Sequence, residues 1–138
     1  MTVTLPPDYR PSEDEPFMNE YQREYFRLKL LRWRTELLRD SDETLLHLQE
    51  GGLQEPDIAD RAQAETDRSL ELRTRDRARK LISKIDAALL RIEDSSYGYC
   101  EETGEPIGVR RLEARPIATM SIEAQERHER QERTHRDE

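Results

Sequence analysis

Two long amphipathic helix patterns, separated by one short acidic segment, constrain this chain more than any other feature. They occupy residues 19–93, and residues 51–60 between them read GGLQEPDIAD. Because so few residues connect the two helices, they must run antiparallel. At about 30 residues each and about 1.5 Å per residue, each helix would extend about 45 Å. The sequence therefore predicts a long antiparallel two-helix coiled coil with an acidic tip.

The first helix pattern has recognisable start and stop signals. Asn19 can cap the helix, with Gln22 three residues later as its capping-box partner. The pair Gly51 and Gly52 should end it, because glycine readily adopts the left-handed conformation of a helix end. Trp33 and Leu37 lie beside the predicted apolar stripe. That stripe contains leucines repeating every seven residues and their apolar neighbours: Tyr21, Tyr25, Leu28, Leu31, Leu38, Leu45 and Leu48.

The second helix pattern follows Pro56, and Asp57 or Asp60 can cap it. Its apolar positions alternate four and three residues apart, which is the spacing of a coiled-coil seam. These positions are Ala78, Ile82, Ile85, Leu89 and Ile92.

The pattern changes after Asp94. Residues 97–108 are dense in turn formers and predict a tight β-turn unit with at most two very short strands. Residues 109–115 predict a helical turn closed by Pro116, and a last helix should begin near Ser121. The small core expected here consists of Tyr99, Cys100, Ile107, Val109, Leu112, Ile117, Met120 and Ile122.

The expected fold is therefore mainly α, with four parts. The parts are a flexible N-terminal arm (1–16), the coiled coil (17–94, with its tip near 51–62), a small globular module (95–120) and a C-terminal helix (121–138).

Composition excludes several classes of protein. With 33% hydrophobic and 39% charged residues, the chain is too polar for a thick globular core. A net charge of -8 argues against wrapping nucleic acid, since phosphate binding needs concentrated positive charge. The sequence shows neither an apolar run long enough to span a membrane nor a signal-peptide pattern. Its single cysteine cannot form an internal disulfide, which favours the reducing cytoplasm.

Basic residues nevertheless gather in two stretches of this acidic chain. Guanidinium groups suit phosphate oxygens and acidic protein surfaces, which predicts a binding face. The structural alternative is a set of salt bridges with Glu71, Asp76, Asp86 and Glu113, and the sequence favours neither. The basic residues are Arg73, Arg75, Arg77, Arg79, Lys80 and Lys84 in the second helix, and Arg110, Arg111 and Arg115 in the module.

Four segments together resemble a known family. They are residues 17–20 (FMNE), 56–62 (PDIADRA), 69–77 (SLELRTRDR) and 97–116, in which YGYC is followed by IGVRRLEARP. In this order they resemble the DksA/TraR family of bacterial transcription regulators, from about residue 17 to the end.

The resemblance implies a specific function within the stringent response. Members bind RNA polymerase rather than DNA, and their coiled coil enters the secondary channel so that its tip approaches the active site. They alter the stability of promoter open complexes, often with the nucleotide alarmone ppGpp. Ribosomal RNA promoters are typically inhibited, and some amino-acid biosynthesis promoters are activated.

The resemblance also implies roles for individual residues. Asp57 and Asp60 match the family's two tip aspartates, and Ala62 matches a further tip position. The alternative role for the aspartates is helix capping, since a carboxylate is stabilised at a helix N-terminus.

Other matched positions lie further along the chain. Arg77 matches a polymerase contact, whereas Leu81, Lys84 and Arg115 match positions that contribute to a ppGpp site at the polymerase interface. Gln125 stands where the family has a lysine, which removes one charge from that site.

The family's C-terminal module is a four-cysteine zinc ribbon, and here the chain departs from the pattern. Its four metal positions hold Cys100, Thr103, Ser121 and Ala124. Because a structural zinc site needs four nitrogen or sulfur ligands, we expect the module to fold without zinc and the chain to take no cofactor. Cys100 is then expected to be a small packing residue.

Three alternatives to a polymerase regulator fit parts of the sequence. Heptads alone are equally typical of a structural coiled-coil adaptor or oligomerisation module. An enzyme holding a metal on Asp57 and Asp60 would lack a pocket, a nucleophile and a shell that excludes water. A DNA-binding finger is disfavoured by its missing ligands and by the net charge. We therefore expect a monomer, not an enzyme, whose partners are RNA polymerase and ppGpp, with no direct DNA or membrane binding.

Overall fold

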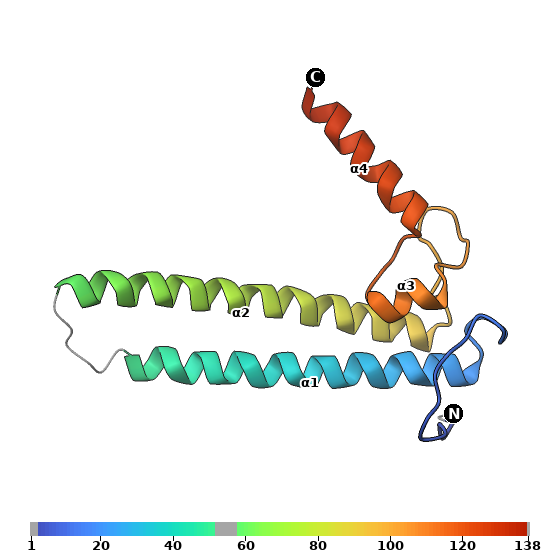
Figure 1. Cartoon of the computed structure of the whole chain (residues 1–138), viewed down its shortest axis with the longest axis horizontal. Helices are drawn as coiled ribbons and strands as arrows, with labels where there is room; N and C mark the ends of the chain where they lie inside the picture. The colour runs from blue at the N-terminus through green and yellow to red at the C-terminus, as the bar shows by residue number, and fades with distance from the viewer. Residues whose placement is uncertain (1–2, 52–57, 138) are drawn as a thin grey trace. The chain divides into compact units, whose positions relative to one another are not determined.

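The chain is mainly helical, as predicted. A computed structural model describes residues 3–51 and 58–137, except for the side chains of 44–45, 47–51, 58–60 and 135–137. The described residues form four helices: α1 (Glu20–Gly51), α2 (Ile58–Glu93), α3 (Val109–Ala114) and α4 (Ile122–Asp137) (Figure 1). Within this part of the chain there is no β-strand longer than one isolated bridge between Tyr99 and Pro106. None of the described helices is long and apolar enough to cross a membrane.

The chain divides into two compact units. The hairpin unit contains residues 31–86, which are the two helical arms, and the terminal unit contains the described residues up to Leu30 and from Ala87 onward. In the hairpin unit, Arg34 Nε lies 2.7 Å from Asp86 Oδ1. Since Arg34 is near the start of one arm and Asp86 ends the other, the arms are antiparallel, as predicted. Ala78 and Ile85 are buried there.

The predicted seam of α2 is confirmed in part, whereas that of α1 is not. Ala78, Ile85 and Ile92 are buried. Ile82 and Leu89 are half-buried, and Ala88 is buried although it was not predicted.

Among the described side chains of α1, those of Gln22, Phe26 and Leu30 are fully buried, and they are spaced four residues apart. Tyr21, Leu28 and Leu38, which the sequence placed in the stripe, are 40–45% exposed. That part of the prediction is wrong because the face that α1 buries in the terminal unit depends on a distant residue. The ring of Phe26 packs against the ring of Tyr97, 5.8 Å away between centroids.

Asn19 caps α1, as predicted. The backbone N–H of Gln22 donates to Asn19 Oδ1 over 2.8 Å. The reciprocal bond is displaced by one residue, because Gln22 Oε1 accepts from the backbone N–H of Met18, also over 2.8 Å. Gln22 also donates through Nε2 to the carbonyl of Ser12 at 3.1 Å, so its buried amide ties the N-terminal arm to the start of α1.

The described part of the arm, residues 3–16, contains neither helix nor strand, and it contacts α1 through aromatic rings. Tyr9 packs against Tyr21 and Tyr25, with centroid distances of 5.8 and 6.2 Å. Its hydroxyl donates to Glu15 Oε2 over 2.6 Å. This hydrogen bond is the main reason that the pKa of Glu15 lies below its usual value. The flexibility of the arm stays a prediction.

The segment between α2 and α3 is a tight hairpin-like turn, in keeping with the predicted β-turn unit. Cys100 N donates to the carbonyl of Glu105 over 2.8 Å, and Ile107 N donates to the carbonyl of Gly98 over 2.7 Å. Gly104 N donates back to the carbonyl of Cys100 over 2.9 Å. Further along, α4 begins as predicted: the backbone N–H of Ala124 donates to Ser121 Oγ over 3.2 Å, which makes Ser121 its N-cap.

The small core of the terminal unit differs in part from the predicted set. Cys100, Val109, Leu112 and Ile117 are buried as expected. Tyr99 and Ile122 are 38% and 50% exposed, so their predicted burial is wrong. Buried residues of this segment that the prediction omitted are Tyr97, Pro116, Ala118, Ser121 and Ala124.

Candidate functional site

The first candidate surface is the tip of the hairpin unit. Asp57 lies outside the described residues, and Asp60 lies in the first turn of α2 without a described side chain. Ala62 is exposed, as is every residue from 61 to 70. Within this exposed stretch of α2, Gln63 Nε2 donates to Asp67 Oδ1 over 3.1 Å. The described part of α2 that adjoins the tip therefore presents side chains to solvent on all sides.

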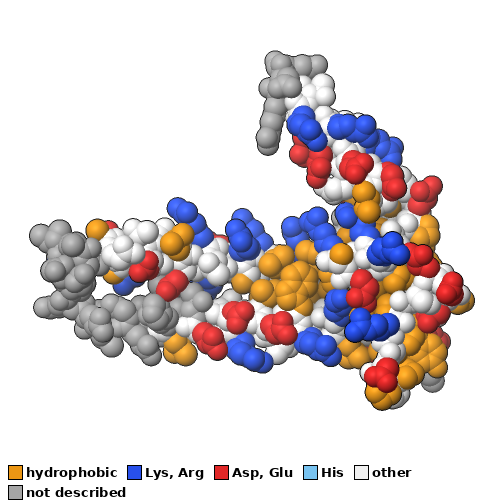
Figure 2. Space-filling view, in the orientation of Figure 1, with side chains coloured by type: hydrophobic (Ala, Val, Ile, Leu, Met, Phe, Trp, Pro, Cys, Tyr) orange, Lys and Arg blue, Asp and Glu red, His pale blue; other side chains and the backbone are white. Residues whose placement is uncertain are grey.

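The second candidate surface is one face of α2. Arg77, Leu81 and Lys84 are four and three residues apart, so they lie on the same side of the helix. Arg77 and Lys84 are exposed and Leu81 is half-buried. Leu70, seven residues before Arg77, is also exposed. Figure 2 shows Lys and Arg side chains projecting along α2. We call Leu70, Arg77, Leu81 and Lys84 the α2 face.

The described ion pairs bear on the two interpretations of the basic stretch in α2. Asp86 pairs with Arg34 at 2.7 Å, and Glu113 pairs with Lys29 at 2.9 Å. Both acids are therefore engaged by α1. With the described residues, none of the six cations between Arg73 and Lys84 forms an ion pair. Their guanidinium and ammonium groups remain available for a partner, which favours the binding interpretation.

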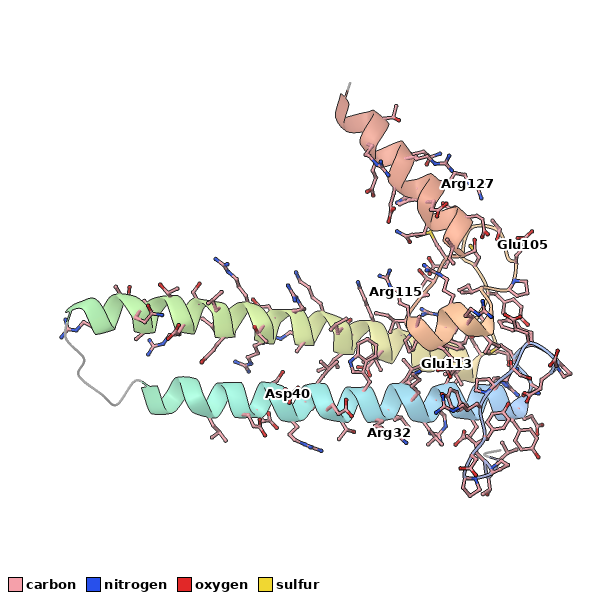
Figure 3. All side chains as sticks on the ribbon, viewed as in Figure 1. Arg32, Asp40, Glu105, Glu113, Arg115 and Arg127 are labelled. Carbon is pink, nitrogen blue, oxygen red and sulfur yellow. The ribbon has the colours of Figure 1, made fainter. Side chains whose placement is uncertain are left out.

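Arg115 belongs to the terminal unit, whereas the α2 face belongs to the hairpin unit. It follows α3 directly, and its side chain is exposed (Figure 3). Its backbone N–H donates to the carbonyl of Arg111 over 2.7 Å, and its carbonyl accepts from Ala118 N over 3.0 Å. The backbone of Arg115 is thus held on both sides while its guanidinium faces solvent.

The third candidate site is the turn around Cys100. Burial raises the pKa of the Cys100 thiol, but hydrogen bonds outweigh this effect and bring the pKa to about 6. The donors are the Thr103 side chain and the backbone N–H groups of Ser121, Thr103 and Glu102. Cys100 is buried, as expected of a small packing residue, and the same hydrogen bonds favour its charged form.

Of the four positions assigned to metal, Cys100, Thr103 and Ser121 meet at this turn, and Ala124 is joined to it through its hydrogen bond with Ser121. Among the described residues, no three His, Cys, Asp or Glu side chains are grouped so that they could hold a metal ion. His128 instead lies along α4, with Nε2 3.4 Å from Glu132 Oε1.

A long antiparallel helix pair in one unit and a finger-like turn module in the other define the class of protein. Within that class, two family models match the chain. The N-terminal domain of the DnaK suppressor protein DksA matches residues 22–92, and the prokaryotic dksA/traR C4-type zinc finger matches residues 95–130. The chain belongs to the DksA family.

Individual relatives agree with this assignment. The chain is 73% identical over 130 residues to the RNA polymerase-binding transcription factor DksA of Caulobacter vibrioides, covering 94% of this chain and 92% of that protein. It is 48% identical over 115 residues to the protein of the same name from Escherichia coli K12, covering 83% and 76%. The structure of transcription factor DksA2 from Pseudomonas aeruginosa is similar, with a TM-score of 0.79 and 44% identity over 85% of this chain and 90% of that one.

The comparisons bear on two further expectations. Relatives at 73% and 48% identity are named as transcription factors, which is a non-enzymatic role, so the chain is not an enzyme. The expectation that it takes no cofactor is contradicted, because the match to a C4-type zinc finger suggests zinc binding.

The expectation that the chain takes no zinc came from the side chains at the four metal positions. A closed zinc site takes four nitrogen or sulfur ligands, and Thr103, Ser121 and Ala124 offer two hydroxyls and a methyl group. These residues do not fit a four-sulfur site, and no step proposed below runs through a zinc ion.

Proposed function

We propose that this chain binds RNA polymerase through its secondary channel and, together with ppGpp, changes the stability of promoter open complexes. Ribosomal RNA promoters are inhibited and some amino-acid biosynthesis promoters are activated, as part of the stringent response. The observation that carries the proposal is the 73% identity, over 94% of the chain, to a protein named as an RNA polymerase-binding transcription factor.

The tip acts next to the active site of the polymerase in this proposal. Asp57 and Asp60 bring negative charge to a place where basic side chains and magnesium ions respond to it by direct Coulomb interaction. Ala62 completes the tip. The exposure of every residue from 61 to 70 supports insertion, because this part of α2 can enter a channel without unpacking a core.

The α2 face and Arg115 supply the contacts to polymerase and ppGpp. Arg77 contacts the polymerase, and Leu81, Lys84 and Arg115 contribute to the ppGpp site. Arg77, Lys84 and Arg115 are exposed and form no ion pair with the described residues. Charge-assisted hydrogen bonds to phosphate or carboxylate oxygens therefore need no internal pair to be broken first.

The proposal extends to organisation and location. The protein acts as a monomer in the cytoplasm, without binding DNA directly, and its net charge of -8 supports the last point. The working division is an arm (1–16), the coiled coil (17–94), the finger-like module (95–120) and the C-terminal helix (121–138).

Transcription in vitro from a ribosomal RNA promoter tests this function. Purified RNA polymerase is titrated with the full-length protein, with and without ppGpp, and open-complex lifetime is measured by challenge with a competitor. We expect the lifetime to shorten with the protein alone and to shorten further with ppGpp. An unchanged lifetime at protein concentrations that saturate binding would exclude the proposed function, as would failure to bind polymerase.

A further inference from the structure

One lysine joins α1 to the short helix α3. Lys29 Nζ lies 3.0 Å from the carbonyl oxygen of Glu113 and 2.9 Å from its side-chain Oε2. The two residues are 84 positions apart in sequence, and both belong to the terminal unit. Each side chain is about one third exposed, so the pair is accessible to water without being fully solvated.

Other groups act on the carboxylate of Glu113, which is labelled in Figure 3. Burial raises the pKa of Glu113, but hydrogen bonds from Tyr25 and Lys29 outweigh this and lower it below the usual value. The positive charges of Lys29 and of Arg10 in the N-terminal arm act in the same direction. Lys29 Nζ also lies 5.9 Å from the centroid of the Tyr25 ring. Glu113 therefore ties α3 to α1, and the charge of Arg10 in the arm also acts on it.

The helix that Lys29 holds is too short to be stable alone. α3 has six residues, and its N-cap, Gly108, makes no side-chain capping bond. Helices of this length depend on packing and on external partners for their terminal backbone groups. Val109 and Leu112 bury one side of α3. Lys29 supplies the partner at the other end, since it donates to a last-turn carbonyl and places a cation where the helix dipole favours one.

The position of Arg115 follows from this attachment. Arg115 comes two residues after Glu113, and its backbone N–H is bonded within α3 to the carbonyl of Arg111. If α3 frays from its C-terminal end, the backbone from which the Arg115 side chain projects moves with it. The hydrogen bonds of Arg115 to Arg111 and Ala118 hold its backbone, so the direction of its guanidinium depends on α3 staying in place.

We infer that Lys29 is a positioning residue for Arg115: through its two bonds to Glu113 it holds α3 on α1, and so sets the response to ppGpp without touching the nucleotide. The inference deepens the proposed function and rests on it, because Arg115 is assigned to the ppGpp site there.

The structural step is tested first, by amide hydrogen exchange on the free full-length protein. Lys29→Met removes both bonds while keeping the length of the apolar stem. We expect the amides of Leu112 and Arg115, which are bonded within and at the end of α3, to exchange about three- to tenfold faster. Lys29→Arg, which keeps a cation at the site, should restore slow exchange.

Arg27→Met is the matched control for this step. Arg27 forms an ion pair of similar length, 2.8 Å to Glu24, but both partners lie on α1 and neither contacts α3 through it. Exchange at Leu112 and Arg115 should therefore match the wild type in Arg27→Met. Equal exchange in Lys29→Met and wild type would overturn the inference, whatever happens in transcription.

The functional step uses the same variants in the ribosomal RNA promoter assay. Lys29→Met should lose most of the additional effect of ppGpp on open-complex lifetime, whereas its effect without ppGpp and its affinity for polymerase should change less than about twofold. Lys29→Arg should recover the ppGpp effect, and Arg27→Met should retain it. Faster exchange in Lys29→Met together with an undiminished ppGpp response would overturn the inference.

Arg115→Ala separates failure of the inference from failure of the proposed function. If Arg115→Ala loses the ppGpp response and Lys29→Met keeps it, Arg115 acts as proposed but does not depend on Lys29. If Arg115→Ala responds to ppGpp as the wild type does, the assignment of Arg115 is wrong and positioning by Lys29 has no functional consequence. Loss of the response in both variants supports the inference.

Discussion

Gly98, in the turn before α3, lies against the residues that precede α1. Its φ is +93°, and a Cβ built there would lie 3.1 Å from both Met18 Cγ and Phe17 Cζ. Phe17 is held from the other side, since its ring packs edge-on to Tyr99 with centroids 5.5 Å apart. A larger residue at position 98 would therefore suffer both backbone strain and crowding.

We predict that Gly98→Ala lowers the free energy of unfolding by about 2–4 kcal/mol. About half of this comes from an L-residue at positive φ, and the rest from displacing Met18 and Phe17. Urea denaturation of the purified protein measures the change. Gly104→Ala provides the control, because Gly104 also has positive φ, +74°, but has open space around it, so the loss there should be about 1–2 kcal/mol. Equal losses would show that the contact with Met18 and Phe17 contributes nothing.

Single residues differ in how far their roles could be predicted. Asn19 was recognisable as a helix cap, and Ser121 as the place where the last helix begins, because a helix start depends on neighbours within three positions. The sequence did not show that Tyr97 is buried in the core in place of Tyr99. The two tyrosines flank Gly98, and periodicity does not say which side chain points inward. The fold settles it through distant partners: Tyr97 packs on Phe26 and donates its hydroxyl to the carbonyl of Pro116 over 2.7 Å.

At the scale of an element, the buried face of α1 could not be predicted from the sequence either. Its leucine heptad predicts a stripe through Leu31 and Leu38, yet in the terminal unit the buried face passes through Gln22, Phe26 and Leu30. A hydrophobicity pattern counts Gln22 as polar and therefore does not predict that it is buried. Its burial is explained by the arm, because its side-chain amide accepts from the backbone N–H of Met18 and donates to the carbonyl of Ser12 and to Glu15 Oε2.

The α2 face provides a prediction at this scale. Lys84→Ala should weaken the ppGpp-dependent part of regulation more than binding to polymerase without ppGpp, because Lys84 is exposed and can direct its charge at a phosphate. Arg79→Ala is the control, since Arg79 is an exposed cation five residues earlier, on a different side of the helix. Polymerase affinity and open-complex lifetime are measured with and without ppGpp. Equal weakening of both activities in Lys84→Ala would instead indicate a simple docking role.

The tip provides a second prediction, which separates regulation from helix capping. The double variant Asp57→Asn, Asp60→Asn removes two charges and keeps groups that can cap a helix. If both aspartates only stabilise α2, the free energy of unfolding should change by at most about 1 kcal/mol, and inhibition of transcription should be the same as in the wild type. We expect binding to polymerase to persist and inhibition of a ribosomal RNA promoter to fall. Wild-type inhibition by the double variant would remove both residues from the proposed site.

At the scale of the whole molecule, the two units carry separate spectroscopic reporters. The single tryptophan, Trp33, lies in the hairpin unit, whereas all five tyrosines (Tyr9, Tyr21, Tyr25, Tyr97 and Tyr99) lie in the terminal unit. Tryptophan fluorescence and tyrosine near-ultraviolet circular dichroism can therefore follow the units independently. Cooperative unfolding of the two would give coincident transitions, and separate unfolding would not.

Acid should destabilise the terminal unit. The pKa values of Glu15, Glu24, Asp94 and Glu113 are all lowered, and all four residues belong to this unit. A carboxyl group with a lowered pKa in the folded state stabilises it fully above the unfolded pKa, and this contribution disappears as pH falls through the folded pKa. The tyrosine-monitored stability should therefore be constant near neutral pH and should decline below about pH 4.5. Glu113→Gln should show a shallower decline, because the neutral amide has no proton to gain. A decline as steep as that of the wild type would show that the carboxylate held by Lys29 and Tyr25 contributes nothing to acid sensitivity.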